Sequence, residues 1–191
     1  SALPTYKEQS PSKIEKEEIV EEELRENNEI IPYRFKKNPA LVGTLVHQLM
    51  EYLIETRNQL NSRQAIDSIL NEYNADEYYY RNILNSVIDQ IRSGGYPQNN
   101  QAPQDILKEL LSADEVYCEL PFCYQDKEIL WRGFMDVVYR KKDQWIIVDY
   151  KTNADPSDLD NVYKEQLKAY KKAFKEMTGN DAETMIYHIA V

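Results

Sequence analysis

Apolar residues recur with a helical period in the first half of the chain and with a strand period in the second half. The pair Asn38-Pro39 is typical of a helix start, with a capping side chain followed by a proline. Leucines at every fourth position from Leu41 to Leu53 then predict an amphipathic helix that ends near residue 58. Further helices are expected over about 62–73, 76–93 and 104–112, with a Gly-, Pro- and Asn-containing loop before the last one.

Alternation with a period of two begins near residue 116 and predicts three strands. Pro121 lies inside the first strand and indicates an edge position or a bulge. The second and third strands are expected over 129–140 and 145–151, joined by the polar turn 141–144. Alternate residues of the first strand are expected to share one face: Val116, Cys118, Leu120, Phe122 and Tyr124.

A helix and a final strand follow. The helix is expected over about 161–177, with Asp160 as its N-cap and Gly179 as its C-terminal stop, and the strand over 184–191. This order of elements predicts an α/β fold with a mixed central sheet flanked by helices. The final strand can pair parallel to an earlier strand because the helix serves as the crossover.

Composition and charge describe a globular chain with an acidic leader. The 191 residues, 42% of them hydrophobic and 29% charged, suffice for one domain with its own core. The net charge of −10 is uneven, because residues 1–30 contain nine Glu against four Lys or Arg. We therefore expect a leader or linker over 1–37, partly disordered or helical, and a single domain over 38–191.

The chain begins with Ser-Ala and stops within the strand-like run MIYHIAV, which indicates a fragment of a longer protein. Neither a signal peptide nor an apolar run of membrane-spanning length is found in the sequence, so no membrane partner is expected. Cys118 and Cys123 are the only cysteines. Two thiols cannot hold a zinc ion or an iron–sulfur cluster alone, and a reducing, cytoplasmic setting is expected.

Two aspartates interrupt the apolar strands. In a hairpin centred between Lys142 and Asp143, Asp136 and Asp149 lie opposite each other on one face, and Lys151 shares that face. Two facing carboxylates repel unless a positive charge lies between them. A divalent cation with oxygen ligands, Mg²⁺ or Mn²⁺, satisfies that requirement.

A structural Asp–Lys salt bridge beside an unrelated aspartate would account for the same residues. Lysine alone compensates two carboxylates only in part. The apolar run Trp-Ile-Ile-Val before Asp149 places this charge at the end of a buried strand, which favours the metal site.

The segments "GFMDVV" and "IIVDYKT" resemble motifs II and III of the PD-(D/E)XK nucleases, in the version of the RecB-type exonuclease domain. "GTLVHQLME" (43–51) resembles the G-x-x-x-H helix of this family, and "EQLKAY" (165–170) resembles its Q-x-x-x-Y motif. The likeness is greatest to the C-terminal nuclease domain of AddA-type helicase–nuclease subunits, over about residues 38–191. It implies a restriction-endonuclease-like αβββαβ core with extra N-terminal helices. The superfamily's iron–sulfur branch carries four cysteines, and two are present here.

The resemblance implies a role for each matching residue. The metal ligands would be His47, Asp136, Asp149 and the backbone carbonyl of Tyr150. Lys151 would orient or polarise the attacking water and stabilise the transition state. Catalysis would therefore rest on Asp136, Asp149 and Lys151, while Gln166 and Tyr170 would position DNA through its backbone.

Several of these residues have plain alternatives. His47 is also compatible with an ordinary helix histidine, and Glu51, one turn on, with either an orienting partner of its ring or a solvated side chain. Glu119 is an acid of second rank near the expected site. Tyr170 can serve core packing with Gln166 on the surface. The lysines at 164, 168, 171, 172 and 175 suit either contact with phosphates or a solvated helix face.

Together these features predict a Mg²⁺- or Mn²⁺-dependent DNA exonuclease domain that hydrolyses phosphodiester bonds. By resemblance, it would belong to an ATP-dependent helicase–nuclease in double-strand break repair and recombination. Its partners would be DNA, the helicase portion of the same chain and a second helicase/nuclease subunit. The alternative is an inactive nuclease-like module that grips a partner subunit or DNA. A hydrolase of small phosphoesters is disfavoured by the lysine strip and by the lack of a glycine-rich phosphate loop.

Overall fold

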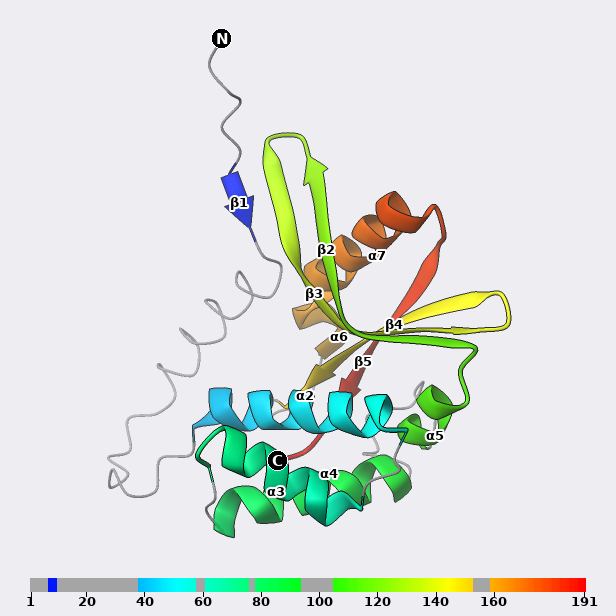
Figure 1. Cartoon of the computed structure of the whole chain (residues 1–191). Coiled ribbons are helices and arrows are strands. Elements are labelled where there is room, and N and C mark those ends of the chain that lie inside the picture. The colour runs from blue at the N-terminus through cyan, green and yellow to red at the C-terminus, as the bar shows by residue number, and fades with distance from the viewer. Residues whose placement is uncertain (1–6, 10–37, 58–60, 76–77, 94–104, 153–158) are drawn as a thin grey trace.

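The computed structural model describes residues 7–9, 38–57, 61–75, 78–93, 105–152 and 159–191. In Figure 1 a bent sheet separates two helical layers, with α2 to α5 on one side and α7 on the other. Among the described helices, none combines the length and apolar character that a membrane span requires. The predicted leader 1–37 lies outside the described residues except for 7–9, which form the short strand β1 (Lys7–Gln9).

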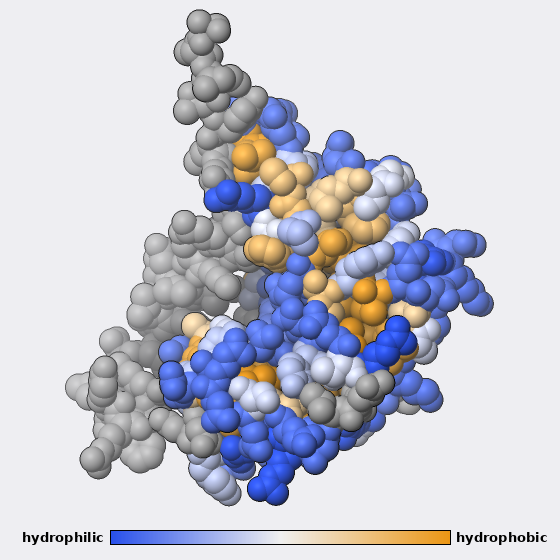
Figure 2. Space-filling model, in the orientation of Figure 1, coloured by the Kyte–Doolittle hydropathy of each residue, from blue (hydrophilic) through white to orange (hydrophobic). Residues whose placement is uncertain are grey.

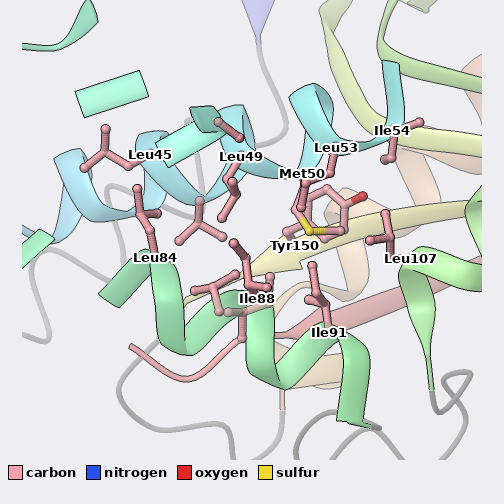
Figure 3. Close-up of a cluster of buried hydrophobic side chains, with 14 of the residues drawn as sticks. Leu45, Leu49, Met50, Leu53, Ile54, Leu84, Ile88, Ile91, Leu107 and Tyr150 are labelled. Atoms are coloured by element: carbon pink, nitrogen blue, oxygen red, sulfur yellow. The ribbon is translucent and has the colours of Figure 1, made fainter. Parts of the chain in front are cut away.

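The first helical layer forms as its sequence predicts. α2 (Pro39–Glu55) begins at Asn38, whose side chain accepts a hydrogen bond from the Leu41 amide at 3.2 Å. Figure 3 shows the apolar stripe of α2 facing α4 and Tyr150 of the sheet, and this packing holds α2 against the sheet. The other helices of the layer are α3 (Ser62–Glu72), α4 (Tyr78–Ser93) and α5 (Ile106–Leu111).

The central sheet is mixed, as predicted. β2 (Glu115–Asp126), β3 (Ile129–Lys141) and β4 (Gln144–Lys151) are antiparallel neighbours, and β5 (Ala182–His188) pairs parallel with β4. β1 pairs parallel with the first residues of β3. The parallel pair confirms the crossover that the sequence predicts between the third strand and the last.

The prediction that one face of β2 carries all five alternate apolar residues is wrong. Val116 and Cys118 pack on the side of α2, whereas Phe122 and Tyr124 pack on the side of α7. Between them Glu119 adopts φ 47°, in the left-handed region, so the alternation of side chains changes faces there. Pro121 follows Glu119 by two residues on β2, an edge strand of the described sheet, where proline is tolerated.

The helix predicted over 161–177 is divided. α6 (Leu159–Val162) and α7 (Lys164–Thr178) meet at Tyr163, which is buried with its ring below Lys151. Asp160 lies inside α6 and is not the N-cap of the long helix, so that expectation is wrong. Gly179 ends α7 with φ 74°, as predicted, and its amide donates to the Lys175 carbonyl at 2.8 Å.

Candidate functional site

A cleft of about 1330 Å³ opens beside the place where the pairing of β3 with β4 ends. Its walls are the N-terminal half of α2, the β2–β3 hairpin beyond Glu119, the end of β4 and the start of α7. On the side shown in Figure 2, apolar residues gather over the β2–β3 hairpin and hydrophilic ones over the helices below it. The site residues predicted from the sequence line this cleft: His47, Asp136, Asp149, Tyr150, Lys151, Gln166 and Tyr170.

The β3–β4 hairpin has the predicted register, and its ladder ends beside the two aspartates. Val137 pairs with Val148, and the paired positions continue from there to the turn. At the next position the strands separate, and Asp136 Oδ2 accepts a hydrogen bond from the Tyr150 amide at 2.7 Å. The carboxylate therefore takes over a backbone partner where the ladder stops, which holds Asp136 at the floor of the cleft.

His47 reaches this floor from α2. Its Nδ1 lies 3.3 Å from Asp136 Oδ1, and its Nε2 lies 3.3 Å from the Tyr150 carbonyl oxygen. Glu119 joins them, because its left-handed backbone directs the side chain to the same place. One ligand atom from each of His47, Glu119 and Asp136 lies within 4.8 Å of the others. Glu119, which the sequence indicated only as a secondary candidate, thus lies beside the predicted metal ligands His47 and Asp136.

Asp149 belongs to a second group of contacts. Its Oδ2 forms an ion pair with Lys151 Nζ at 2.8 Å, and the same ammonium donates to Gln166 Oε1 at 2.9 Å. Gln166 in turn donates to the Tyr170 hydroxyl at 2.8 Å. The ring of Tyr163 lies 4.0 Å from Lys151 Nζ, a cation–π contact. These contacts hold Lys151 in one position at the edge of the cleft.

Gln166 is 1% exposed, so the alternative that placed it on the surface is wrong. Its amide links Lys151 to Tyr170, which is also buried and packs against Phe122 with ring centroids 5.5 Å apart. Glu51 accepts a hydrogen bond from Gln48 at 3.1 Å, whereas the described partners of the His47 ring are Asp136 and Tyr150. Glu51 therefore does not orient that ring in this structure.

Burial and mutual repulsion disturb the ionisation of the site. The pKa of Asp149 is raised to about 6, chiefly by burial and also by repulsion from Asp136, while Lys151 opposes the rise. Burial also raises the pKa of Glu119, and Asp136 adds to it. Burial alone would lower the pKa values of His47 and Lys151, yet the surrounding carboxylates outweigh it and both are raised. Lys151 is thus held in its charged form.

The residues present fit a divalent cation. Carboxylates and an imidazole converge on one space, a ligand set that Mg²⁺, Mn²⁺ and related ions accept. Asp149 Oδ2 is buried, and its described cationic partner is Lys151 Nζ at 2.8 Å. This one ammonium compensates the carboxylates of the site only in part, which favours a metal cation beside them.

The lysines of α7 lie on the outer side of this helix. Lys168 pairs with Glu165, Lys175 with Asp181, and Lys172 approaches Asp126 at 3.9 Å. The helix buries the opposite side against the sheet through Ala169, Tyr170, Ala173 and Phe174. Acidic neighbours thus partly neutralise the positive strip.

Comparison with known protein families identifies this arrangement. The model of the PD-(D/E)XK nuclease superfamily matches residues 19–190, which is most of the chain. The chain belongs to the PD-(D/E)XK nuclease superfamily. Residues 149–151 of the matched range read Asp-Tyr-Lys, and the structure places this aspartate and lysine in direct contact.

Similar proteins agree with this family. The chain is 26% identical over 190 residues to a subunit of an ATP-dependent helicase/nuclease from Staphylococcus haemolyticus, covering 86% of this chain and 14% of that protein. It is 27% identical over 158 residues to the protein of the same name in Clostridium acetobutylicum, with 75% and 13% covered. The chain therefore spans about one seventh of the length of these relatives.

A solved structure shares the fold. A candidate exonuclease from Eubacterium rectale superposes with a TM-score of 0.51 at 12% sequence identity, covering 88% of this chain and 59% of that one. The restriction-endonuclease-like α/β fold expected from the sequence is thus confirmed. The PD-(D/E)XK domain has the predicted order of helices, three strands, helix and strand, here with α6 and α7 in place of one helix.

Proposed function

We propose that this chain is the nuclease domain of a longer ATP-dependent helicase/nuclease and hydrolyses phosphodiester bonds of DNA from an end, with Mg²⁺ or Mn²⁺ as cofactor. One observation carries the proposal. Within a PD-(D/E)XK fold, His47, Glu119 and Asp136 converge in an open cleft beside the buried pair of Asp149 and Lys151. An inactive binding module would have no need to maintain this costly cluster of charges.

The ligands proposed for the cation are His47, Asp136, Asp149 and the Tyr150 carbonyl, with Glu119 added because of its position. The Nε2–H of His47 can donate to the Tyr150 carbonyl and leave Nδ1 for the metal, the arrangement usual for metal-bound histidines. That carbonyl oxygen has a second lone pair available. When bound, the cation lowers the pKa of a coordinated water and neutralises charge on the phosphate.

Lys151 would act on the attacking water and on the charge of the transition state. Asp149, Gln166 and the ring of Tyr163 fix its ammonium, and the raised pKa keeps it charged at neutral pH. A fixed positive charge can orient the attacking water and stabilise the negative charge that develops in the transition state. Lys151 is therefore a poor general base in this site. Gln166 and Tyr170 would act on DNA mainly through the position that they give to Lys151.

The biological setting follows from the relatives. They are helicase/nuclease subunits, and this chain covers only about one seventh of their length. We infer that a helicase portion of the same protein feeds DNA to the cleft, and that a second subunit takes part. Processing of DNA ends in double-strand break repair and recombination would be the role of the whole assembly.

Cleavage assays on the fragment test the proposal. Linear and closed circular DNA are incubated with the wild type, Lys151→Ala and Lys168→Ala, in Mg²⁺, in Mn²⁺ and in chelator. Lys168 is an exposed lysine of α7 outside the cleft and serves as the matched control. We expect metal-dependent loss of linear DNA with the wild type and Lys168→Ala, and a decrease of at least about 100-fold with Lys151→Ala.

Two further measurements make the assay decisive. Circular dichroism shows whether Lys151→Ala is folded, and titration calorimetry shows whether it still binds the metal. Equal cleavage by the wild type and Lys151→Ala would refute the role of this site. Cutting of closed circles would refute the requirement for an end, and DNA binding without cleavage by a metal-loaded wild type would favour the inactive module.

A further inference from the structure

Phe134 is an aromatic residue exposed at the mouth of the cleft. Its side chain on β3 is 59% exposed. Large exposed hydrophobic side chains also occur elsewhere in the described part of the chain, and single ones are normal on protein surfaces. Among them, however, Phe134 alone lines the cleft that contains the catalytic residues. Its position, more than its exposure, calls for an explanation.

The fold directs this ring away from the core. Met135, the next residue of β3, is fully buried in the cluster beneath α7, so its neighbour faces the open side of the hairpin. Phe134 pairs across the hairpin with Pro121, which is exposed as well. Asp136 follows two residues later, and the Cα atoms of Phe134 and Asp136 are therefore about 7 Å apart. A nucleotide whose phosphate lies at Asp136 has its base within reach of this ring.

Arg132 completes the surface. It lies two residues before Phe134 on β3, is exposed, and lines the same cleft. An arginine beside an exposed aromatic ring is the combination with which proteins bind single-stranded nucleic acids. In such proteins the arginine guanidinium contacts the phosphate backbone, and the aromatic ring stacks on a base. The β2–β3 hairpin thus offers both contacts along one wall that ends at the catalytic aspartate.

We propose that Phe134 stacks on an unpaired base at the end of a single DNA strand, while Arg132 contacts the backbone of the same strand. This inference rests on the proposed nuclease function and specifies its substrate. Inside a duplex each base is stacked on both neighbours, so its flat faces are covered, and only the outer side of the terminal pair is open. A separated strand, the product of a helicase, presents that face.

Fluorescence of a base analogue tests the stacking directly. Single-stranded oligonucleotides carry one fluorescent adenine analogue at successive positions from the end, and binding is measured in Ca²⁺, which accepts the same oxygen ligands. The variants are Phe134→Ala, Phe134→Tyr and, as a matched exposed aromatic outside the cleft, Tyr78→Ala, which replaces a side chain 82% exposed. Fully paired oligonucleotides are measured in parallel.

We expect the wild type and Phe134→Tyr to quench the analogue at one position and Phe134→Ala to lose this quenching. Single-strand affinity should fall about 5- to 150-fold in Phe134→Ala and remain unchanged in Tyr78→Ala. Absence of quenching by the wild type, equal affinity of Phe134→Ala, or equal losses on duplex and single strand would each overturn the inference. Cleavage with unaltered binding refutes the stacking alone, whereas quenching without cleavage in Mg²⁺ or Mn²⁺ refutes the nuclease function alone.

Discussion

The burial of Asp149 should make the metal-free domain less stable at neutral pH than in mild acid. Burial, assisted by repulsion from Asp136, raises the pKa of this carboxyl from 3.8 to about 6, despite the ion pair with Lys151. The folded protein therefore keeps the proton at pH values where the unfolded chain has lost it. The stability associated with this group is fully present below pH 3.8 and is lost as the pH rises through 6.

The magnitude follows from the two pKa values. The difference between about 6 and 3.8 corresponds to roughly 3 kcal/mol of unfolding free energy at neutral pH. About 2 kcal/mol of this is lost between pH 4.5 and 7.5. The rest is lost below pH 4.5, because the unfolded carboxyl is already largely ionised at that pH while the folded one keeps its proton. Against a total stability of about 5–15 kcal/mol, such a change is readily measured.

Urea unfolding in chelator, followed by tryptophan fluorescence, measures the effect in the wild type and in Asp149→Asn. Groups whose pKa does not depend on Asp149 cancel in the difference between the two proteins. We expect the unfolding free energy of the wild type minus that of the variant to fall by about 2 kcal/mol from pH 4.5 to 7.5. Asp143→Asn, in the exposed β3–β4 turn, is the control for removal of a carboxylate at the surface. A constant or rising difference for Asp149→Asn would refute the reasoning.

Gly43→Ala tests the local fit of α2. An added Cβ would lie 3.6 Å from Thr152 Oγ1, which is an ordinary contact. Because alanine has the better helix propensity, the variant should be more stable by up to about 1 kcal/mol in a urea titration, and a loss of stability would show that the packing needs the glycine. Tyr163→Leu removes the ring below Lys151 and should lower kcat/KM about 5- to 30-fold, whereas Tyr163→Phe keeps the ring and should retain activity. An equal loss in both Tyr163 variants would assign the effect to the hydroxyl group instead.

The Gly43 substitution also tests whether a close approach to α2 requires the glycine. A glycine inside a predicted helix suggests that something approaches the helix closely. In the structure Thr152 lies near, yet at a distance that leaves room for a methyl group. A glycine at this place is therefore not required by the packing of the domain itself, and a loss of DNA cleavage in a stable Gly43→Ala variant would point to the substrate.

Local patterns predicted most elements and the register of the catalytic hairpin. The turn at Lys142 and Asp143 fixes the pairing of β3 with β4, because the position of a hairpin turn sets which residues of the two strands lie opposite each other. The start of α2 and the end of α7 were predicted from Asn38 and Gly179, whose capping roles depend only on neighbouring residues. Such features are encoded over a few positions, and a single sequence suffices to find them.

The errors have a common origin. Alternation of apolar residues says nothing about a single residue with positive φ, so the change of faces at Glu119 was missed, and with it the approach of this acid to His47. The break at Tyr163 was missed for a similar reason, because the buried contact with Lys151 involves a strand that precedes the helix. No signal within either segment indicates these contacts.

The sequence by itself determined the type and order of the elements and the residues with chemical potential, since periodicity, capping and charge placement are local properties. Only the tertiary structure decided which carboxylates share one space. His47 and the Tyr150 carbonyl are 103 positions apart, and Lys151 and Gln166 are 15 apart, yet each pair lies within hydrogen-bonding distance. Burial, and the pKa changes that it causes, arises from packing between elements, which no local pattern specifies.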